Sequence, residues 1–314
     1  MVTIPEVSMG STGLVVPSLG MGMAVYPLTS SETMKSAILH AIQLGYRHFD
    51  TAAIYRSQHP LGEAIKEAQR LGFIKSRDEL FITSKLWCSE AHHGCVLPAL
   101  KKTLQILQLE YLDLYLIHCP AILKLEGYEL PMGFKSIWES MEKSQKLGLT
   151  RFIGVSNFCY RKLEELLVDV KIPPAINQVE MNPVWQQKKL REFCKEKGIH
   201  ITAYSPLGAK GTLWGTNRAM ECEVLKQIAE AKRKTVAQVC LRWVYEQGMS
   251  IIVKSLNKER LKENLEIFDW MLSQEELQKI DGISQQKRSS GLEEFISEEN
   301  PYKSLDELCD GETS

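Results

Sequence analysis

Four titratable residues stand at or just after the carboxyl ends of short apolar segments. Asp50 ends YRHFD, Lys85 ends LFITSK, His118 ends LDLYLIH, and Tyr55 follows Asp50 in DTAAIY. A lysine ammonium favours the phenolate form of a nearby tyrosine, and an aspartate can keep a buried lysine charged. A neutral imidazole can donate a hydrogen bond to a carbonyl oxygen. Together these groups would donate a proton and stabilise an oxyanion, which suits carbonyl reduction by a hydride carrier.

Each of these residues also has a structural interpretation. Asp50 and Lys85 could form an ion pair in the core, and Tyr55 could be a loop aromatic. Networks of this kind perturb pKa values in many places outside active sites. The catalytic interpretation is favoured because three of the four groups end predicted strands, and such ends meet at one mouth of a barrel.

The elements that would position these residues alternate along the chain. Short runs rich in Ile, Val, Leu and Tyr predict strands at 17–22, 46–50, 80–85, 112–118, 151–157, 175–181, 200–205 and 250–255. Apolar residues at helical spacing predict helices at 30–45, 58–72, 95–109, 132–148, 161–167, 185–198 and 235–248. Eight alternating units predict an α/β fold, a (β/α)8 TIM barrel, with the whole chain, 1–314, forming a single domain. Residues 7–17 are expected to form a β-hairpin that plugs the N-terminal end of the barrel.

The alternative fold is a doubly wound nucleotide-binding sheet. That fold requires Gly-x-Gly-x-x-Gly between its first strand and helix. GMGMAV at 20–25 has only the first two of these glycines, and a long gap separates it from the first predicted helix. The barrel is therefore the preferred interpretation.

Composition and charge exclude several classes of protein. The net charge is -1 with 44% hydrophobic residues, so the chain lacks the excess of basic residues that nucleic-acid binding requires. Its apolar runs are far shorter than the roughly 20 residues that span a membrane. The N-terminal residues MVTIPEVSMGSTG include an acidic residue and no apolar run, so we expect no secretory signal peptide there. The scattered cysteines suggest reduced thiols and a cytoplasmic protein.

One cluster of residues could bind a metal ion. CSEAHHGC brings together Cys88, His92, His93 and Cys95, which are residue types that bind zinc. Their spacing matches no familiar zinc motif and no second cluster accompanies them, so we expect a polar loop and no metal site.

Amides, an aromatic residue and two cations occupy the remaining strand ends. They are Ser156, Asn157, Gln178, Tyr204, Lys254, Ser255 and, just beyond the last strand, Arg260. The amides beside Tyr204 would suit a ring that carries a carboxamide, with Tyr204 stacked on it. The cations and the Ser255 hydroxyl lie where barrels often bind phosphate.

Sequence blocks along essentially the whole chain resemble the aldo-keto reductase family. In order they are GYRHFDTAAIY, LFITSKLW, LDLYLIHCP, IGVSNF, NQVEMNP, TAYSPLG and IVKS followed by ER and EN. The resemblance implies a catalytic tetrad of Asp50, Tyr55, Lys85 and His118, with the hydride coming from nicotinamide C4 of NADPH and the proton from Tyr55. It implies NADPH contacts at Gly22, Met23, Ser156, Asn157, Gln178, Tyr204, Ser205, Leu207, Gly208, Lys254, Ser255, Asn257, Arg260, Glu263 and Asn264.

Narrower phrases resemble plant members that act in specialised metabolism, among them the chalcone, codeinone, methylecgonone and galacturonate reductases. Examples are IKSRDELFITSKLW and LREFCKEKGIHITAYSPLGA. Ala24 and Cys119 stand where other family members have tryptophan, and Trp87 remains as an aromatic wall. The substitutions predict a roomy apolar pocket for bulky cyclic ketones of alkaloid or polyketide metabolism, or for aromatic aldehydes. The acidic segment 290–314 could fold over the barrel mouth as a loop or remain a solvated tail.

Three functions remain open at this stage. The first is a monomeric NADPH-dependent reductase that acts on a small carbonyl substrate. The second is a reductase of the chalcone type that acts with a partner polyketide synthase. The third is a noncatalytic NADPH-binding accessory protein, which the intact set of four catalytic residues disfavours.

Overall fold

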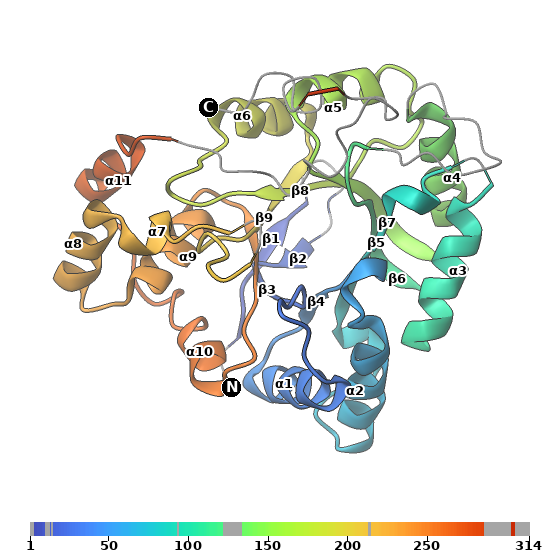
Figure 1. Ribbon diagram of the computed structural model, residues 1–314, viewed down its shortest axis with the longest axis horizontal. Coiled ribbons are helices and arrows are strands. Elements are labelled where there is room, and N and C mark those ends of the chain that lie inside the picture. Colours follow the sequence, from blue (N-terminus) through green and yellow to red (C-terminus); the bar gives the residue numbers. More distant parts are fainter. Residues whose placement is uncertain are drawn as a thin grey trace.

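The computed structural model describes residues 3–9, 13, 15–92, 94–121, 134–212, 215–285 and 303–304. Eight parallel strands form a closed barrel in the order β10-β3-β4-β5-β6-β7-β8-β9 (Figure 1). They are β3 (Leu19–Gly22), β4 (His48–Asp50), β5 (Phe81–Leu86), β6 (Leu112–Ile117), β7 (Thr150–Ser156), β8 (Ile176–Glu180), β9 (His200–Tyr204) and β10 (Ser250–Val253). Every predicted strand is present, with its ends within two residues of the prediction. The TIM barrel is therefore confirmed, and the open doubly wound sheet is excluded.

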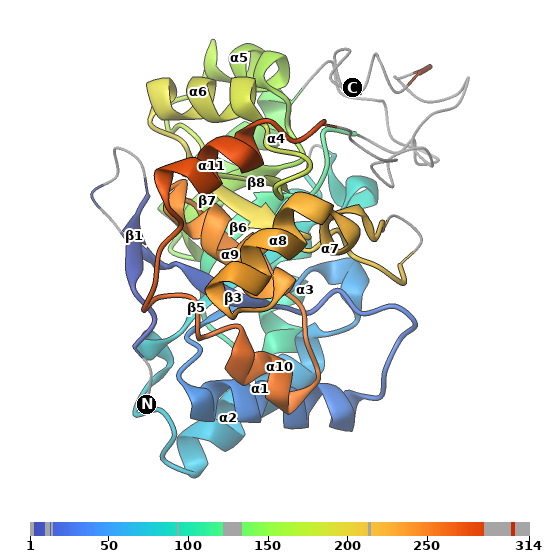
Figure 2. The same ribbon diagram turned by 90° about the vertical axis from the view of Figure 1, so that its left-hand side faces the viewer.

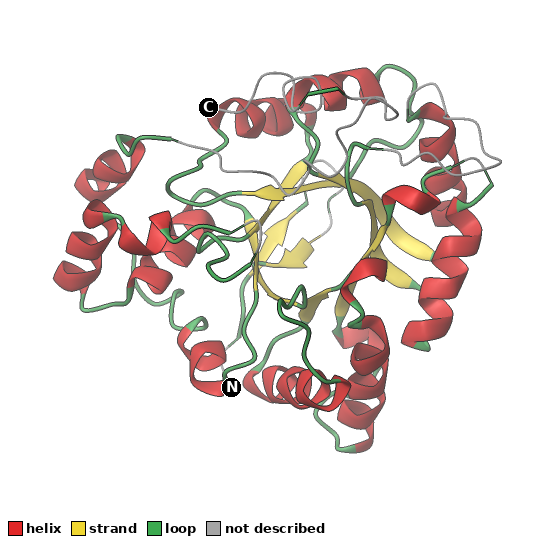
Figure 3. Ribbon diagram, viewed as in Figure 1, coloured by secondary structure: helices red, strands yellow, loops and turns green. Residues whose placement is uncertain are grey.

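Helices surround the barrel and cover the outer faces of its strands (Figure 3). The predicted ones are α1 (Ser31–Leu44), α2 (Gln58–Arg70), α3 (Val96–Leu107), α4 (Lys135–Lys146), α5 (Tyr160–Leu167), α6 (Lys188–Lys197) and α9 (Val236–Glu246). Outside the predictions lie α7 (Arg218–Glu221), α8 (Glu223–Lys232), α10 (Lys258–Glu263) and α11 (Gln274–Asp281). α7 and α10 have four and six residues, which is too short for a helical period to appear in the sequence.

The first helix shows how local sequence sets the bounds of these elements. The Ser30 side chain accepts a hydrogen bond from the Thr33 backbone N–H at 3.2 Å and so caps the N-terminus of α1. Its buried face includes Ile38 and Ile42, which lie one turn apart and face the barrel. Gly45 ends the helix at a φ of 108°, a left-handed conformation that glycine adopts without a steric penalty.

A hairpin closes the N-terminal end of the barrel, as predicted. Its strands β1 (Glu6–Ser8) and β2 (Val15–Pro17) pair antiparallel, and Figure 2 shows β1 at the opposite end of the barrel from α7. Met9 and Val16 pack in one buried cluster with residues such as Phe81 and Leu114 from the barrel strands. This apolar plug seals one end, so the other end is left for ligands.

Two further predictions concern the chain as a whole. The segment 290–314 lies outside the described residues apart from Lys303 and Ser304. Among the helices in the described ranges, none has the length and apolar character needed to cross a membrane.

Candidate active site

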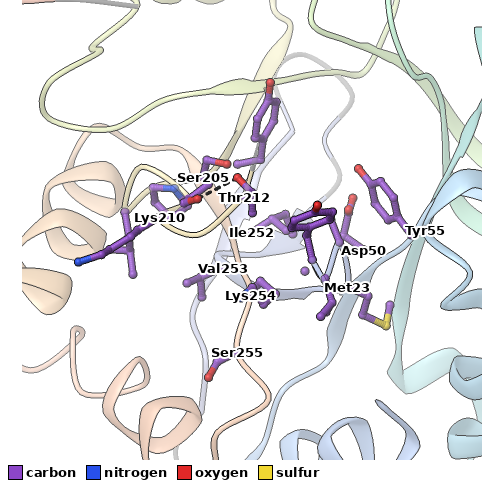
Figure 4. A pocket seen from close by; sticks show the side chains of 18 of the residues that line it. Met23, Asp50, Tyr55, Ser205, Lys210, Thr212, Ile252, Val253, Lys254 and Ser255 are labelled. Atoms are coloured by element: carbon purple, nitrogen blue, oxygen red, sulfur yellow. Dashed lines mark hydrogen bonds between the residues drawn. The ribbon is translucent and has the colours of Figure 1, made fainter. Parts of the chain in front are cut away.

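A cavity of about 900 Å³ opens at the carboxyl ends of the barrel strands (Figure 4). Its wall includes strand-end residues from around the barrel: Gly22, Asp50, Ser156, Gln178, Tyr204 and Val253. The sticks in Figure 4 show Asp50 and Tyr55 on one side of this space and Ser205 and Lys210 on the other. The predicted convergence of strand ends on one mouth is therefore present.

A buried ion pair lies beneath the cavity. Lys85 Nζ lies 2.5 Å from Asp50 Oδ1 and also donates to the Thr51 carbonyl at 3.1 Å. Both side chains are almost fully buried, at 1% and 4% exposed. Burial lowers the pKa of Lys85, and the charge of Asp50 together with their hydrogen bond opposes that shift. Lys85 is the one member of the predicted tetrad that does not line the cavity. It lies beside Asp50 and the Tyr55 ring, so it can influence a ligand through these two residues.

Tyr55 and His118 face the cavity as a hydrogen-bonded pair. The Tyr55 hydroxyl lies 3.2 Å from His118 Nε2, and their rings meet edge to face with centroids 5.5 Å apart. The Trp87 ring also meets the His118 ring edge to face, with their centroids 5.1 Å apart. Burial, with the nearby positive charge of Lys85, lowers the pKa of His118 well below 6.5. The imidazole is therefore neutral at physiological pH.

The predicted direction of the Tyr55 pKa shift is wrong. Burial raises the pKa of Tyr55 well above 10, and the negative charge of Asp50 raises it further. The Lys85 ammonium lies 4.9 Å from the centroid of the Tyr55 ring, and its hydrogen bonds go to Asp50 and Thr51. Its charge is thus largely balanced by its partner, so Tyr55 remains a protonated phenol across neutral pH.

The residues expected to hold a carboxamide ring are bonded to the tetrad. Gln178 Nε2 donates to Asp50 Oδ2 at 2.7 Å. Asn157 Nδ2 donates to the His118 carbonyl at 2.9 Å, and Asn157 Oδ1 accepts from the Tyr204 hydroxyl at 2.6 Å. These bonds fix the amides at the floor of the cavity.

Two cations lie at the other end of the cavity. Lys254 and Arg260 line it, and neither belongs to an ion pair among the described residues. Ser255, Glu263 and Asn264 line the same end. The donor set is thus cationic at one end and amide-rich at the other, which fits a cofactor with a phosphate at one end and a carboxamide at the other.

Glycine at position 22 also fits an extended ligand in this space. A Cβ added there would lie 2.8 Å from the Ile252 side chain, so only glycine keeps the cavity wall open beside Met23. Of the expected cofactor residues, Gly208 and Asn257 do not line the cavity. Gly208 occupies a turn with a φ of +83°, and Asn257 caps α10 by accepting from the Arg260 N–H at 2.9 Å. The described residues therefore fit NADPH in all but these two positions.

The expected pocket residues Ala24, Trp87 and Cys119 all line the cavity. The cavity is also lined by residues that the sequence did not predict: Val25, Tyr26, Leu28, Ile54, Pro206, Ala209, Lys210, Thr212, Asn217, Met220, Thr235, Ala237, Ile252 and Val253. The position of Ile54, directly before Tyr55, was the signal that could have revealed it. Most of the others lie on loops, whose path over the mouth leaves no periodic pattern in the sequence.

The four residues of the candidate metal cluster fall in the sequence between β5 and α3. Cys88 is in the turn Cys88–Glu90 and Cys95 immediately precedes α3, while His93 lies outside the described residues. Within the described ranges, no group of three or more His, Cys, Asp or Glu residues is placed to hold a metal ion.

The fold and the site together define a class of enzyme. A (β/α)8 barrel with a phenol, a neutral imidazole and a Lys–Asp pair at its mouth, beside room for a dinucleotide, belongs to the oxidoreductases that reduce carbonyl groups.

Comparison with known proteins identifies the family. Residues 18–285 match the Aldo/keto reductase family. The 7-acetyl-epi-neemfruitin B aldo-keto reductase of Melia azedarach is 61% identical over 318 residues, covering 99% of this chain and 98% of its own. The NADPH-dependent codeinone reductase 1-4 of Papaver somniferum is 53% identical over 315 residues, covering 98% of each. A crystal structure of a Bombyx mori aldo-keto reductase in complex with NADP matches with a TM-score of 0.83 at 35% identity, covering 90% of this chain and 94% of that one.

The chain therefore belongs to the aldo-keto reductase family and is an NADPH-dependent oxidoreductase.

Proposed function

We propose that this enzyme reduces a bulky cyclic ketone to an alcohol, with Tyr55 as proton donor. The observation that carries the proposal is the Tyr55 hydroxyl at 3.2 Å from a neutral His118 on the wall of a cavity of about 900 Å³. No nucleophile is needed for this reaction, and the residues lining the catalytic end supply a proton donor and hydrogen-bond donors.

The roles of the side chains follow from their positions. When bound, NADPH supplies the hydride that reaches the carbonyl carbon. Tyr55 gives its proton to the carbonyl oxygen, which becomes a much stronger base than a phenolate as negative charge develops on it. A raised pKa of Tyr55 is compatible with this step, because the phenol must be protonated before the reaction begins. Neutral His118 orients the same oxygen through an imidazole N–H.

The Lys85–Asp50 pair supports the proton donor from below. After the proton leaves, the phenolate of Tyr55 lies beside the Lys85 ammonium, which stabilises the negative charge. Asp50 keeps that ammonium in place through the 2.5 Å contact. At the other end, Lys254 and Arg260 would hold the 2'-phosphate, which favours NADPH over NADH.

The wall of the cavity supports the choice of a bulky substrate. Ala24 and Cys119 are small, and both line the cavity, as does Trp87. The large apolar side chains of Leu28 and Ile54 are 59% and 45% exposed and line the same cavity. An apolar rim of this kind favours large ring systems over small polar sugars because it removes apolar surface from water. We further expect a monomer acting in the cytoplasm, which size-exclusion chromatography and a fluorescent fusion would test.

The test is NADPH consumption by the purified enzyme against bulky cyclic ketones, aromatic aldehydes and uronic acids. Tyr55→Phe should bind NADPH with unchanged affinity and lose turnover by on the order of 10²- to 10⁴-fold, because the proton donor alone is removed. Near-normal turnover in this variant would refute the role of Tyr55. Turnover seen only after a polyketide synthase is added would instead indicate the partner-dependent reductase.

A further inference from the structure

The strongest unexplained contact at the site joins Gln178 to Asp50. Gln178 is expected from the family resemblance to touch the nicotinamide, yet its Nε2 donates to Asp50 Oδ2 at 2.7 Å. The residues lie 128 positions apart in sequence, on β8 and β4, and are 2% and 3% exposed. The contact is therefore a charge-assisted hydrogen bond shielded from water, which is stronger than a hydrogen bond between two neutral groups.

The carboxylate of Asp50 divides its two oxygens between two partners. Oδ1 accepts a hydrogen bond from Lys85 Nζ, and Oδ2 accepts one from Gln178 Nε2. An ionised carboxylate only accepts hydrogen bonds, so the amide nitrogen of Gln178 must be the atom that faces it. The amide oxygen of Gln178 then has no partner among the described residues, in a side chain that lines the cavity. Asp50 thus fixes which way the amide points.

We propose that Gln178 is a positioning residue for the catalytic Lys85–Asp50 pair: it holds the second oxygen of Asp50, so that the first stays on Lys85. The inference rests on the proposed function, because the pair matters only if Tyr55 donates a proton beside it. Without the Gln178 donor, a buried carboxylate oxygen loses its partner and the carboxylate is free to rotate away from Lys85. The electrostatic field that the Lys85–Asp50 pair exerts on the Tyr55 hydroxyl then changes, and with it the ease of proton donation.

Other ionisable groups also act on this carboxylate, and a titration must allow for them. The charge of Asp50 acts directly on Lys85 on β5, His48 on β4 and Tyr55 after β4. His118 after β6 is coupled to Lys85, and Tyr204 on β9 is coupled to Tyr55. None of these is altered in the variants below, so a change in pH profile between variants reports on position 178.

The experiment compares Gln178→Met, Gln178→Glu and Ser156→Ala. Methionine keeps the approximate shape of glutamine and removes the donor. Glutamate restores a donor only while it is protonated, because its neutral acid can donate to Asp50 but its carboxylate repels it. The matched control is Ser156→Ala: Ser156 is expected to touch the carboxamide, and its hydroxyl bonds the Gln178 backbone carbonyl at 2.9 Å, not Asp50.

The expected results differ between the variants. Gln178→Met should lower kcat on the order of tenfold at neutral pH, the loss typical of one charge-assisted hydrogen bond. Gln178→Glu should approach wild-type kcat near about pH 5 and lose kcat as pH rises toward about 8. Two adjacent carboxyl groups share one proton, and the pKa for losing it is raised because both would then be negatively charged. Once that proton is lost, the glutamate at position 178 no longer donates to Asp50. Ser156→Ala should weaken NADPH binding and keep the wild-type shape of the pH profile. NADPH affinity is measured separately by quenching of tryptophan fluorescence.

A second readout does not depend on turnover. Without cofactor, the Tm of Gln178→Glu should fall further below that of the wild type as pH rises, while the gap for Ser156→Ala stays constant. The inference is overturned if Gln178→Glu keeps the wild-type pH dependence of both kcat and Tm, with only NADPH affinity changed. An inactive wild-type enzyme would instead count against the proposed function, and the Tm series would still show whether the side chain at position 178 bonds the Asp50 carboxylate.

Discussion

Two histidines buried inside the barrel should make the protein lose stability in mild acid. His48 on β4 is 1% exposed, and His200 on β9 is 5% exposed. Burial lowers the pKa of each from 6.5 to about 4. His200 Nε2 accepts a hydrogen bond from the Ser250 backbone N–H at 3.2 Å, so protonation of that nitrogen would break the bond.

The size and sign of the effect follow from proton linkage. The unfolded chain takes up a proton at each histidine near pH 6.5, whereas the folded protein does so only near pH 4. The contribution of the two neutral histidines to the free energy of unfolding is therefore fully present above about pH 7. It is lost as pH drops through the window between the unfolded and the folded pKa values. From about pH 7 to about pH 5 each histidine should remove about 2 kcal/mol of unfolding free energy, or about 4 kcal/mol for both.

Urea unfolding followed by circular dichroism at these two pH values measures the loss. Because carboxylates also titrate, the decisive quantity is the difference between the wild type and His200→Gln, which keeps a side-chain acceptor for Ser250. The variant should lose about 2 kcal/mol less than the wild type over the same pH interval. The control is His59→Gln, since the His59 side chain is 59% exposed and folding removes little water from it. Equal losses in the wild type and His200→Gln would refute the reasoning.

The remaining predictions concern the site. Arg260→Ala should raise the Kd for NADPH roughly tenfold or more while leaving that for NADH almost unchanged, because only NADPH carries the 2'-phosphate; equal losses in fluorescence titrations would reject this role. Cys119→Trp should fill the cavity and lower kcat/KM for bulky ketones roughly tenfold relative to a small aldehyde, and improved turnover of the bulky ketone would contradict the proposed pocket. Lys85→Met should cost roughly 3–5 kcal/mol of unfolding free energy by leaving Asp50 buried without its cation, and Asp50→Asn in the same chain should restore most of it. Failure of the double variant to recover in urea unfolding would show that lost packing, not charge, sets the cost.

The barrel could be predicted because its evidence is local. Short apolar runs such as LDLYLIH and helical spacings such as that of Ile38 and Ile42 repeat along the chain, and each reports its own element. The same regularity predicted Asp50, Lys85 and His118 at strand ends, and the structure has each within one residue of the end of its strand. The short helices α7 and α10 gave no comparable signal, since a period needs several turns to show.

The sequence by itself determined which residue types stand at the mouth of the barrel, because strand ends and their polar residues are properties of one segment at a time. Only the tertiary structure decided what those residues do to one another. The bond between Gln178 and Asp50 joins strands 128 residues apart, and no local pattern encodes it. The raised pKa of Tyr55 likewise reverses the expectation from charge proximity alone. Burial and hydrogen bonding sum contributions from every neighbouring element, so their balance exists only once the barrel has closed.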